Sequence, residues 1–280
     1  MFTLRQYLLA LLDSRGLTRT LGEIDVCRDE QGRPCFSAGN SAAVFRIRLG
    51  GRIRSLRCYL RPMRHLKEIY GQRLLEKELY LHTSPETGVW VDTVLGDWIE
   101  GSTLHETVAQ AAALRDRESL QILVRLFDRL ALALVTDDRA HGDLKPENII
   151  VGDDGTLCPI DFDASYLPAF AGEISPELGT AAYQHPARTA ADFDERIDDY
   201  PAALISTALH ALAEDPTLWD RYGSSDGLLY TPQRIASDPA YRETLALFEK
   251  RGMAVQYRIA QLLTAPTLRL FGLAELLAEA

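Results

Sequence analysis

The spacing of apolar residues changes from strand-like to helical along this chain. Residues 2–13 carry apolar side chains at helical spacing, which predicts a short amphipathic helix. Between residues 22 and 60, short alternating runs of apolar and polar residues are separated by turn signals, and this pattern predicts strands. Gly50-Gly51 predicts a two-residue hairpin loop between a strand at 44–49 and another at 53–60.

The rest of the chain has mostly helical periodicity. We expect a helix over 66–82 and a strand pair over roughly 88–100, and from residue 103 onward the apolar spacing is helical. Two short apolar runs flank Asp153-Asp154-Gly155, which predicts a hairpin. The segment 166–195 has little periodicity. Further helices are expected over 199–213, 238–250, 253–264 and 268–279.

This order of elements, with strands first and helices afterwards, predicts an α+β fold with two unlike lobes. We expect an N-terminal helical extension over 1–20, a β-rich lobe over 21–97 and a helical lobe over 98–280. A cleft between two lobes is a preferred place for a ligand.

Charge and composition narrow the classes of partner. The formal net charge of −10 argues against non-specific binding to nucleic acid or to anionic membranes, because both require a positive surface. No run of apolar residues approaches the length of a membrane span, and the apolar run Tyr7–Leu12 is too short for a secretory signal. We therefore expect a cytoplasmic protein that binds neither nucleic acid nor membranes.

The four cysteines do not indicate a metal site, because none of them forms a C-x-x-C pair. Cys27 and Cys35 flank a turn signal at 29–34, so they are either two ordinary buried thiols or the partners of a disulfide. The overall cysteine spacing favours reduced thiols, as in cytosolic proteins.

The candidate chemistry lies in one polar string, His141-Gly142-Asp143-Leu144-Lys145-Pro146-Glu147-Asn148, and in Asp161-Phe162-Asp163, which begins 13 residues after it. Each piece alone is typical of polar loop residues that cap turns. Together, at this spacing, they resemble the catalytic loop and the metal-binding motif of the protein-kinase superfamily. The resemblance implies a bilobal, protein-kinase-like fold, with a β-rich first lobe and a helical second lobe.

The resemblance also implies a role for each residue. Phosphoryl transfer depends on positioning and on neutralising charge, so the site needs a carboxylate near the acceptor hydroxyl and oxygen ligands for Mg²⁺. Asp143 is the implied catalytic base and Lys145 the implied partner of the transferred phosphate. Asn148 and Asp161 are the implied metal ligands, and ATP and Mg²⁺ the implied cofactors.

A phosphate-covering loop is expected in the first lobe. Ser37, Gly39, Ala42 and Val44 have the spacing of the family's G-x-G-x-x-G-x-V motif, with two of the glycines replaced. Backbone N–H groups still suit phosphate there, although Cβ atoms limit close approach. An ordinary hairpin turn is the alternative interpretation.

Arg57 occupies the position of the family's nucleotide-binding lysine, in the third strand of the lobe. Its expected partner on the following helix is Glu76, with Glu68 and Glu78 as alternatives. A solvent-facing arginine on a basic strand is the competing interpretation.

The segment from Asp97 to Gly101 resembles the hinge that binds adenine through its backbone. Asp97 and Ile99 are the implied backbone contacts, whereas Trp98 and Ile99 are equally typical of plain core residues.

Two features further along the chain extend the resemblance. Gly179–Pro186 is similar to the G-T-x-x-Y-x-x-P end of a protein-kinase activation segment, which forms the platform for a peptide substrate. Asp198 matches the buried aspartate that braces the catalytic loop, and it also suits a helix N-terminus, where a carboxylate is favourable.

Several positions depart from the family pattern. Gly142 replaces the arginine that pairs with a phosphorylated activation segment, so we expect no strong activation by phosphorylation there. Asp163 replaces a glycine, which predicts a stiffer metal motif or an extra cation ligand. Ala187 replaces a glutamate that usually pairs with a distant arginine, which weakens the likeness to a standard substrate lobe.

These observations lead to three hypotheses. The first is a Ser/Thr protein kinase with weak or atypical activity that acts on a protein substrate. The second is a pseudokinase, a scaffold that binds nucleotide, which the altered glycine loop, Arg57 and Ala187 favour. The third is a small-molecule kinase similar to the aminoglycoside phosphotransferases, whose motifs resemble His141-Gly142-Asp143 and Ile160–Asp163.

Arg57→Lys is expected to raise phosphotransferase activity. A guanidinium is broader than an ammonium and planar, so it holds phosphate differently from the lysine of the family. Initial rates of phosphate transfer for the two proteins, at the same ATP concentration, measure the effect. An unchanged rate would mean that the arginine is well tolerated or lies away from the site.

Overall fold

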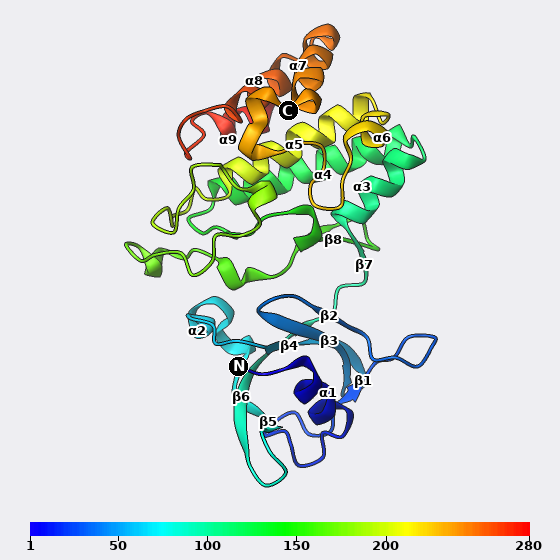
Figure 1. Cartoon of the computed structure of the whole chain (residues 1–280). Coiled ribbons are helices and arrows are strands. Elements are labelled where there is room, and N and C mark those ends of the chain that lie inside the picture. Colours follow the sequence, from blue (N-terminus) through cyan, green and yellow to red (C-terminus); the bar gives the residue numbers. More distant parts are fainter. The chain divides into compact units, whose positions relative to one another are not determined.

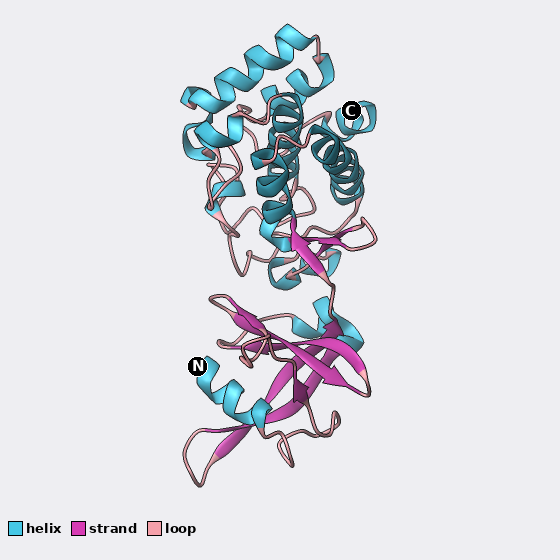
Figure 2. Cartoon of the chain, turned by 90° about the vertical axis from the view of Figure 1, so that its right-hand side faces the viewer, coloured by secondary structure: helices cyan, strands magenta, loops and turns pink.

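A computed structural model describes residues 1–280, which divide into two units, Met1–Ile99 and Glu100–Ala280. Strands dominate unit 1 and helices dominate unit 2 (Figures 1 and 2). The curled sheet of unit 1 and the helical unit 2 confirm the predicted α+β fold of the bilobal, protein-kinase-like kind.

Unit 1 is built on an antiparallel sheet with the strand order β1-β3-β4-β6-β5, with β2 paired to β3 as well. Its strands are β1 (Asp25–Val26), β2 (Phe36–Ala38), β3 (Ala42–Leu49), β4 (Arg52–Tyr59), β5 (Leu74–His82) and β6 (Gly88–Asp97). The predicted two-residue hairpin is confirmed. Leu49 pairs with Arg52, and Gly50 and Gly51 have φ angles of 55° and 80°, which suit a tight turn between twisted strands.

The helix α1 (Leu4–Leu12) covers one face of this sheet, and the predicted helix over 2–13 is thereby confirmed. Tyr7 and Leu11 are fully buried among residues of β3 and β4, and the Tyr7 hydroxyl donates to the Tyr59 carbonyl at 2.6 Å. Each such buried side chain contributes roughly 1.5–3 kcal/mol through removal from water. The first 20 residues therefore share the core of unit 1.

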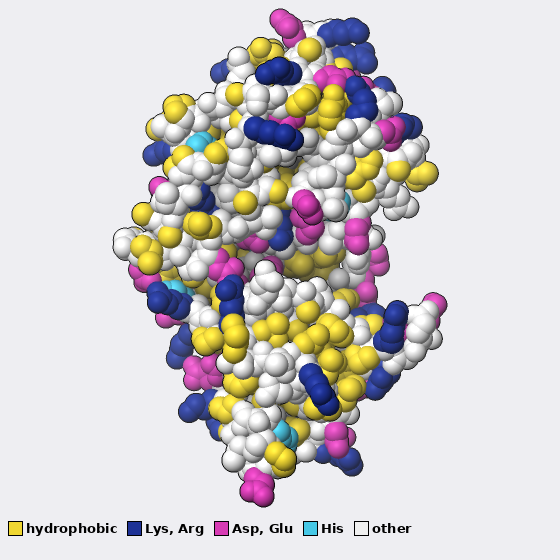
Figure 3. Space-filling model, in the orientation of Figure 1, with side chains coloured by type: hydrophobic (Ala, Val, Ile, Leu, Met, Phe, Trp, Pro, Cys, Tyr) yellow, Lys and Arg dark blue, Asp and Glu magenta, His cyan; other side chains and the backbone are white.

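The outer side of α1 stays apolar as well. Leu9 and Leu12 are exposed, and apolar side chains gather on the face of unit 1 where α1 lies (Figures 1 and 3).

The predicted helix over 66–82 is wrong for most of its length. Only α2 (Leu66–Tyr70) and the 3₁₀ turn η1 (Gly71–Arg73) are helical, and 74–82 is the strand β5. Leu79 and Leu81 pair with Val91 and Val89 of β6, so burial within the sheet overrides a leucine pattern that suits either period. The predicted strand pair over 88–100 is likewise the single strand β6, which lies between β4 and β5.

Unit 2 is mainly helical and confirms the expected helices after residue 103. Its helices are α3 (Leu104–Ala113), α4 (Arg117–Thr136), α5 (Asp199–Glu214), α6 (Leu218–Tyr222), α7 (Pro239–Arg251), α8 (Ala254–Leu262) and α9 (Leu273–Glu279). A small sheet of β7 (Gly101–Thr103), β8 (Ile149–Gly152) and β9 (Leu157–Pro159) contains the predicted hairpin. The short α6 was not expected. The 3₁₀ turns are η2 (Pro146–Asn148), η3 (Phe162–Ala164), η4 (Pro168–Phe170), η5 (Ala181–Tyr183) and η6 (Pro232–Ser237).

The core of unit 2 forms around α4 and α5, which lie side by side (Figures 1 and 2). Asp128 on α4 accepts hydrogen bonds from Ser206 (2.6 Å) and His210 (2.8 Å) on α5, so these buried polar groups satisfy one another. No helix in the chain combines the length and the apolar character that a bilayer crossing requires.

Asp199, at the start of α5, makes the stability of unit 2 depend on pH. The side chain is buried and accepts the Leu270 N–H at 3.1 Å, and burial raises its pKa from 3.8 to about 6. Folding therefore favours the protonated carboxyl, and this stabilisation is lost as the pH rises from the ordinary carboxyl pKa through about 6.

Asp199→Asn is expected to remove this part of the pH dependence. The wild-type protein should lose about 2 kcal/mol of unfolding free energy relative to the variant between the two limits. Urea unfolding of both proteins at about pH 4 and about pH 8 measures the difference. Asp153→Asn, at an exposed carboxyl in the β8–β9 turn, is the matched control. Parallel pH profiles for wild type and Asp199→Asn would contradict the assignment.

Candidate active site

The loop between α4 and β8 is held by a buried carboxylate at the start of α5. Asp198 accepts the backbone N–H groups of His141 (2.5 Å) and Gly142 (3.0 Å). Burial raises the pKa of the Asp198 carboxyl, and the opposing effects of His141, the two N–H donors and Arg188 offset this only in part. This contact fixes the backbone immediately before Asp143.

Asp143 lies among three of the polar groups that the sequence singled out. Asn148 Nδ2 donates to the Asp143 carbonyl (2.9 Å) and to its Oδ2 (3.2 Å), and Lys145 Nζ lies 3.5 Å from Oδ2. The Thr180 N–H donates to Asp143 Oδ1 at 2.5 Å, and Lys145 Nζ donates to Thr180 Oγ1 at 2.9 Å. Asp143, Lys145, Asn148 and Thr180 therefore form one hydrogen-bonded group in unit 2.

The β8–β9 hairpin brings Asp161 close to Asn148 along the backbone. The Ile160 N–H donates to the Asn148 carbonyl at 2.8 Å, and Asp161 is the next residue. His141 fixes the same corner, because its Nε2 lies 2.7 Å from the Ile160 carbonyl and its ring packs on Phe162 with centroids 5.0 Å apart.

Asp161 itself has left-handed backbone angles (φ 65°, ψ 65°), which are uncommon for a residue other than glycine. Such strain persists only where the surroundings impose it, and it is frequent at functional sites.

The donor set here fits a magnesium ion that also binds phosphate. Asn148 uses its Nδ2 on Asp143, which leaves its Oδ1 without a protein donor. No group of three or more His, Cys, Asp or Glu side chains suits a metal held by protein alone. Mg²⁺ needs only one or two protein oxygens when phosphates and water complete its octahedron. Asn148 and Asp161 carry oxygens of the kind that this coordination uses.

Two positions near Asp143, both occupied by glycine, have no room for a side chain. Gly142 has φ +81°, and a Cβ there would lie 2.0 Å from the Ala164 carbonyl oxygen. Gly179 has φ +72°, and a Cβ there would lie 2.7 Å from the Gly142 carbonyl oxygen and 3.0 Å from Asp143 Oδ1. Any side chain at position 142 would therefore clash with the neighbouring backbone.

One residue beside this group was missed at the level of sequence. Arg188 is buried and donates to the Gly142 carbonyl at 3.1 Å. It lies just beyond the Gly179–Pro186 motif, and its type and position gave no signal, because arginine is ordinarily a surface residue.

Several predicted nucleotide-binding residues of unit 1 share the sheet face opposite its apolar core. Val44 on β3 pairs with Arg57 on β4, and Arg57 pairs with Val94 on β6. Ser37 on β2 pairs with Val44 from the other side. Their neighbours in sequence, such as Phe45 and Leu56, belong to the core cluster, so the alternation of a strand places this row on the other face. The Arg57 guanidinium lies 5.8 Å from the Tyr59 ring.

The predicted phosphate-covering loop is the tight turn between β2 and β3. The Gly39 N–H donates to the Ala42 carbonyl at 2.9 Å, and Ala42 is buried whereas Ser37 and Gly39 are exposed.

The predicted hinge residues lie at the end of β6. The Asp97 carbonyl accepts the Ser55 hydroxyl at 3.1 Å, and the Asp97 carboxylate lies 3.4 Å from Arg54. Ile99 is half-buried and is the last residue of unit 1. Trp98 packs against Arg46, with the guanidinium carbon 5.7 Å from the ring centroid.

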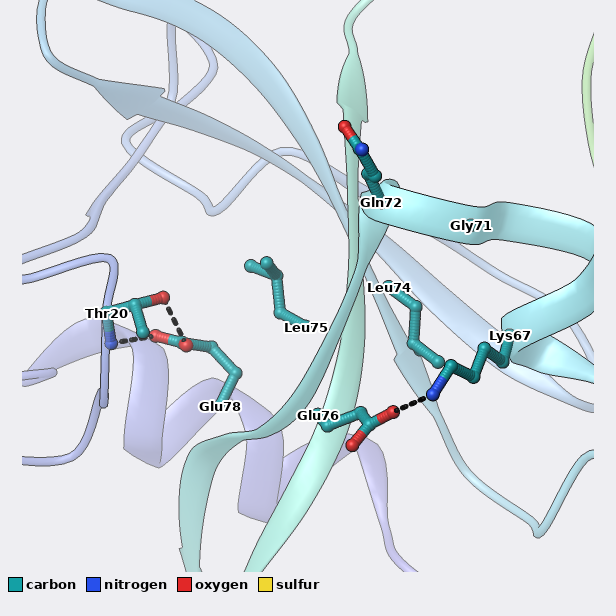
Figure 4. A pocket seen from close by; sticks show the side chains of 8 residues that line it. All are labelled: Thr20, Lys67, Gly71, Gln72, Leu74, Leu75, Glu76 and Glu78. Atoms are coloured by element: carbon teal, nitrogen blue, oxygen red, sulfur yellow. Dashed lines mark hydrogen bonds and ion pairs between the residues drawn. The ribbon is translucent and has the colours of Figure 1, made fainter.

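Glu76 was expected on a helix, and that expectation is wrong because the residue lies on β5. Its carboxylate lies 3.6 Å from Lys67 Nζ, in the wall of a cavity of about 590 Å³ (Figure 4). Glu78, in the same wall, is bound by the Thr20 N–H (2.8 Å) and hydroxyl (2.6 Å). Of the candidates for the partner of Arg57, only Glu68 lies on a helix, α2.

Comparison with known proteins gives distant similarity to protein kinases. The chain is 28% identical to CBL-interacting protein kinase 17 of Oryza sativa subsp. japonica over 172 residues, which are 58% of this chain and 35% of that protein. It is 34% identical to serine/threonine-protein kinase PknL of Mycobacterium tuberculosis over 113 residues, 38% of this chain and 27% of that protein. The match to serine/threonine-protein kinase chk1 of Schizosaccharomyces pombe is 25% over 160 residues, 55% of this chain and 31% of that protein.

No protein-family model matches the chain. The chain spans between 27% and 35% of the length of these curated relatives. The similarities support a kinase-like relationship.

Gly142→Ala is expected to destabilise unit 2 much more than Gly155→Ala. Both glycines have nearly the same φ, +81° and +79°, but a Cβ at Gly155 meets nothing within 4 Å. The backbone conformation alone costs about 1–2 kcal/mol, so any larger loss at Gly142 measures the steric contact with Ala164. Urea unfolding of the two variants and the wild type gives both values. Equal losses would show that the loop adapts without strain.

Proposed function

We propose that this chain transfers the γ-phosphoryl group of ATP to Ser or Thr hydroxyls of a protein substrate, with weak or atypical activity. The observation that carries the proposal is the hydrogen-bonded group of Asp143, Lys145, Asn148 and Thr180. It combines a carboxylate, a cation and an amide with the threonine of the motif that resembles a peptide platform.

The proposed chemistry follows from the placement of these groups. Asp143 orients the acceptor hydroxyl and takes its proton as the new O–P bond forms and the bond to the β-phosphate oxygen of ADP breaks. Lys145, between Asp143 and Thr180, balances the charge on the transferred group. Bound Mg²⁺ would neutralise charge on the phosphates, with Asn148 and Asp161 as its protein ligands.

Unit 1 supplies the proposed nucleotide contacts. Val44 and Arg57 are neighbours on one sheet face, where an apolar side chain suits the base and a guanidinium suits phosphate. Ser37, Gly39 and Ala42 would cover the phosphates through their turn, and the backbone of Asp97 and Ile99 would contact adenine. Because the Asp97 carbonyl already accepts the Ser55 hydroxyl, Ile99 has the freer backbone for this role. Glu76 is not part of the proposed set, because it lies on β5 beside Lys67.

A nucleotide-binding scaffold is the second candidate function. Both oxygens of Asp143 already have partners, Oδ1 through the Thr180 N–H and Oδ2 through Asn148 and Lys145. A base held in this way has little capacity left for a substrate hydroxyl until Thr180 moves. The direct contact between Thr180 and Lys145 argues against the third hypothesis, a small-molecule kinase, because it ties the candidate site to the peptide-platform motif.

The proposal is tested first by ligand-linked stabilisation. ATP with Mg²⁺ is expected to stabilise the protein by about 2–3 kcal/mol at 100 times its Kd, as measured by thermal shift. Asp161→Ala should lose the magnesium dependence of this shift, whereas Asp153→Ala, an exposed carboxyl nearby in sequence, should retain it.

Transfer of labelled phosphate from ATP to a generic protein substrate then separates the two candidates. Asp143→Asn is expected to lower kcat by about 100- to 10,000-fold while the ATP-dependent thermal shift persists. Stabilisation by ATP without any transfer by the wild type would favour the scaffold. No stabilisation and no transfer would overturn the proposed function.

A further inference from the structure

A buried arginine contacts the backbone of the candidate catalytic loop. Arg188 is buried, with 9% of its surface exposed, and its Nη1 donates to the Gly142 carbonyl at 3.1 Å and to Gln184 Oε1. Its Nε and Nη2 have no hydrogen-bond acceptor. Burial lowers the pKa of this guanidinium, and a buried cation with unsatisfied donors is costly. Such a cost calls for an explanation beyond packing.

The contacts of Arg188 complete a clamp around Gly142. On the N–H side, Asp198 accepts the backbone N–H groups of His141 and Gly142. On the carbonyl side, Arg188 donates to Gly142, and the N–H of the same peptide unit, that of Asp143, points to His141 Nδ1 at 3.4 Å. The backbone on the two sides of Gly142 is therefore held by two side chains from other segments, Asp198 at its N–H and Arg188 at its carbonyl.

The Arg188 guanidinium also supports the segment 179–188, which lies beside the Asp143 carboxylate. The position of a Cβ on Gly179 lies 2.8 Å from Gln184 Nε2, 2.7 Å from the Gly142 carbonyl oxygen and 3.0 Å from Asp143 Oδ1. Arg188 bonds to both Gln184 and Gly142, so it joins the segment 179–188 to the loop at the point where Thr180 meets Asp143.

We propose that Arg188 is a positioning residue, which aligns Asp143 by locking the segment 179–188 onto the Gly142 carbonyl. The proposal rests on the proposed function, in which Asp143 accepts the proton of the substrate hydroxyl. Gly142 has no room for a side chain, so the loop carries no cation of its own at that position. Arg188, from the segment 179–188, places a guanidinium against the Gly142 carbonyl instead.

The kinetic test compares Arg188→Met with Arg125→Met. Arg125 is exposed on α4 of the same unit, so its variant controls for the loss of an arginine. Arg188→Met is expected to lower kcat by about 10- to 100-fold, the effect of a small misplacement of a catalytic group, with the KM for ATP unchanged. Arg188→Lys keeps a buried cation and should recover part of kcat. An unchanged kcat in Arg188→Met would overturn the proposal.

Amide hydrogen exchange provides a readout that does not need activity. Arg188→Met should raise exchange in 141–145 and 178–184, while α4 and α5 keep their protection. If the wild type transfers no phosphate but this local effect appears, the proposed function fails and the alignment by Arg188 stands.

Arg188→Met could also raise amide exchange across the whole of unit 2, which would indicate a general loss of stability. Two milder variants, Gln184→Met and Arg188→Lys, then decide whether Arg188 is a merely structural residue. Gln184→Met removes one acceptor of Arg188 and leaves the guanidinium in place, so it should raise exchange in the same two segments to a smaller extent. Global loosening in Gln184→Met and in Arg188→Lys as well would overturn the proposal.

Discussion

The candidate site depends on the backbone at Gly142, where there is no space for even one extra carbon. The carbonyl oxygen of Ala164 lies 2.0 Å from the position of a Cβ, and Asp198 accepts the N–H groups of His141 and Gly142. Because the peptide cannot rotate without losing these contacts, the next residue, Asp143, has a defined direction. The contacts of Asp143 with Lys145, Asn148 and Thr180 depend on that direction.

The grouping of polar side chains around Asp143 could be predicted from the sequence because it is local. Asp143, Lys145 and Asn148 lie within six residues of one another, and a short hairpin returns the chain to Asp161. Short spacing leaves few ways to arrange these groups. Arg188 could not be found in this way, since its contact with the Gly142 carbonyl joins segments more than 40 residues apart in the sequence, which no periodicity encodes.

Only part of unit 1 could be predicted from the sequence. The strands up to residue 60 and the Gly50-Gly51 turn were predictable, because alternation and turn residues are local signals. The segment 74–82 was not, because its leucines suit a helix or a strand, and only pairing with β6 decides between them. The row of Val44, Arg57 and Val94 combines the local β3–β4 hairpin with the pairing of β4 and β6, which are distant in sequence.

The short length of α2 has a consequence for any control exerted through unit 1. In protein kinases, the position of a helix in the first lobe governs whether the nucleotide lysine meets its glutamate partner. In unit 1 the helix before β5 is the five-residue α2, which is too short to be stable apart from its anchors and leads through one 3₁₀ turn into a paired strand. It is too short, and too closely joined to β5, to move as an independent helix. A ligand that moved α2 would therefore also disturb the start of β5 and its pairing with β6.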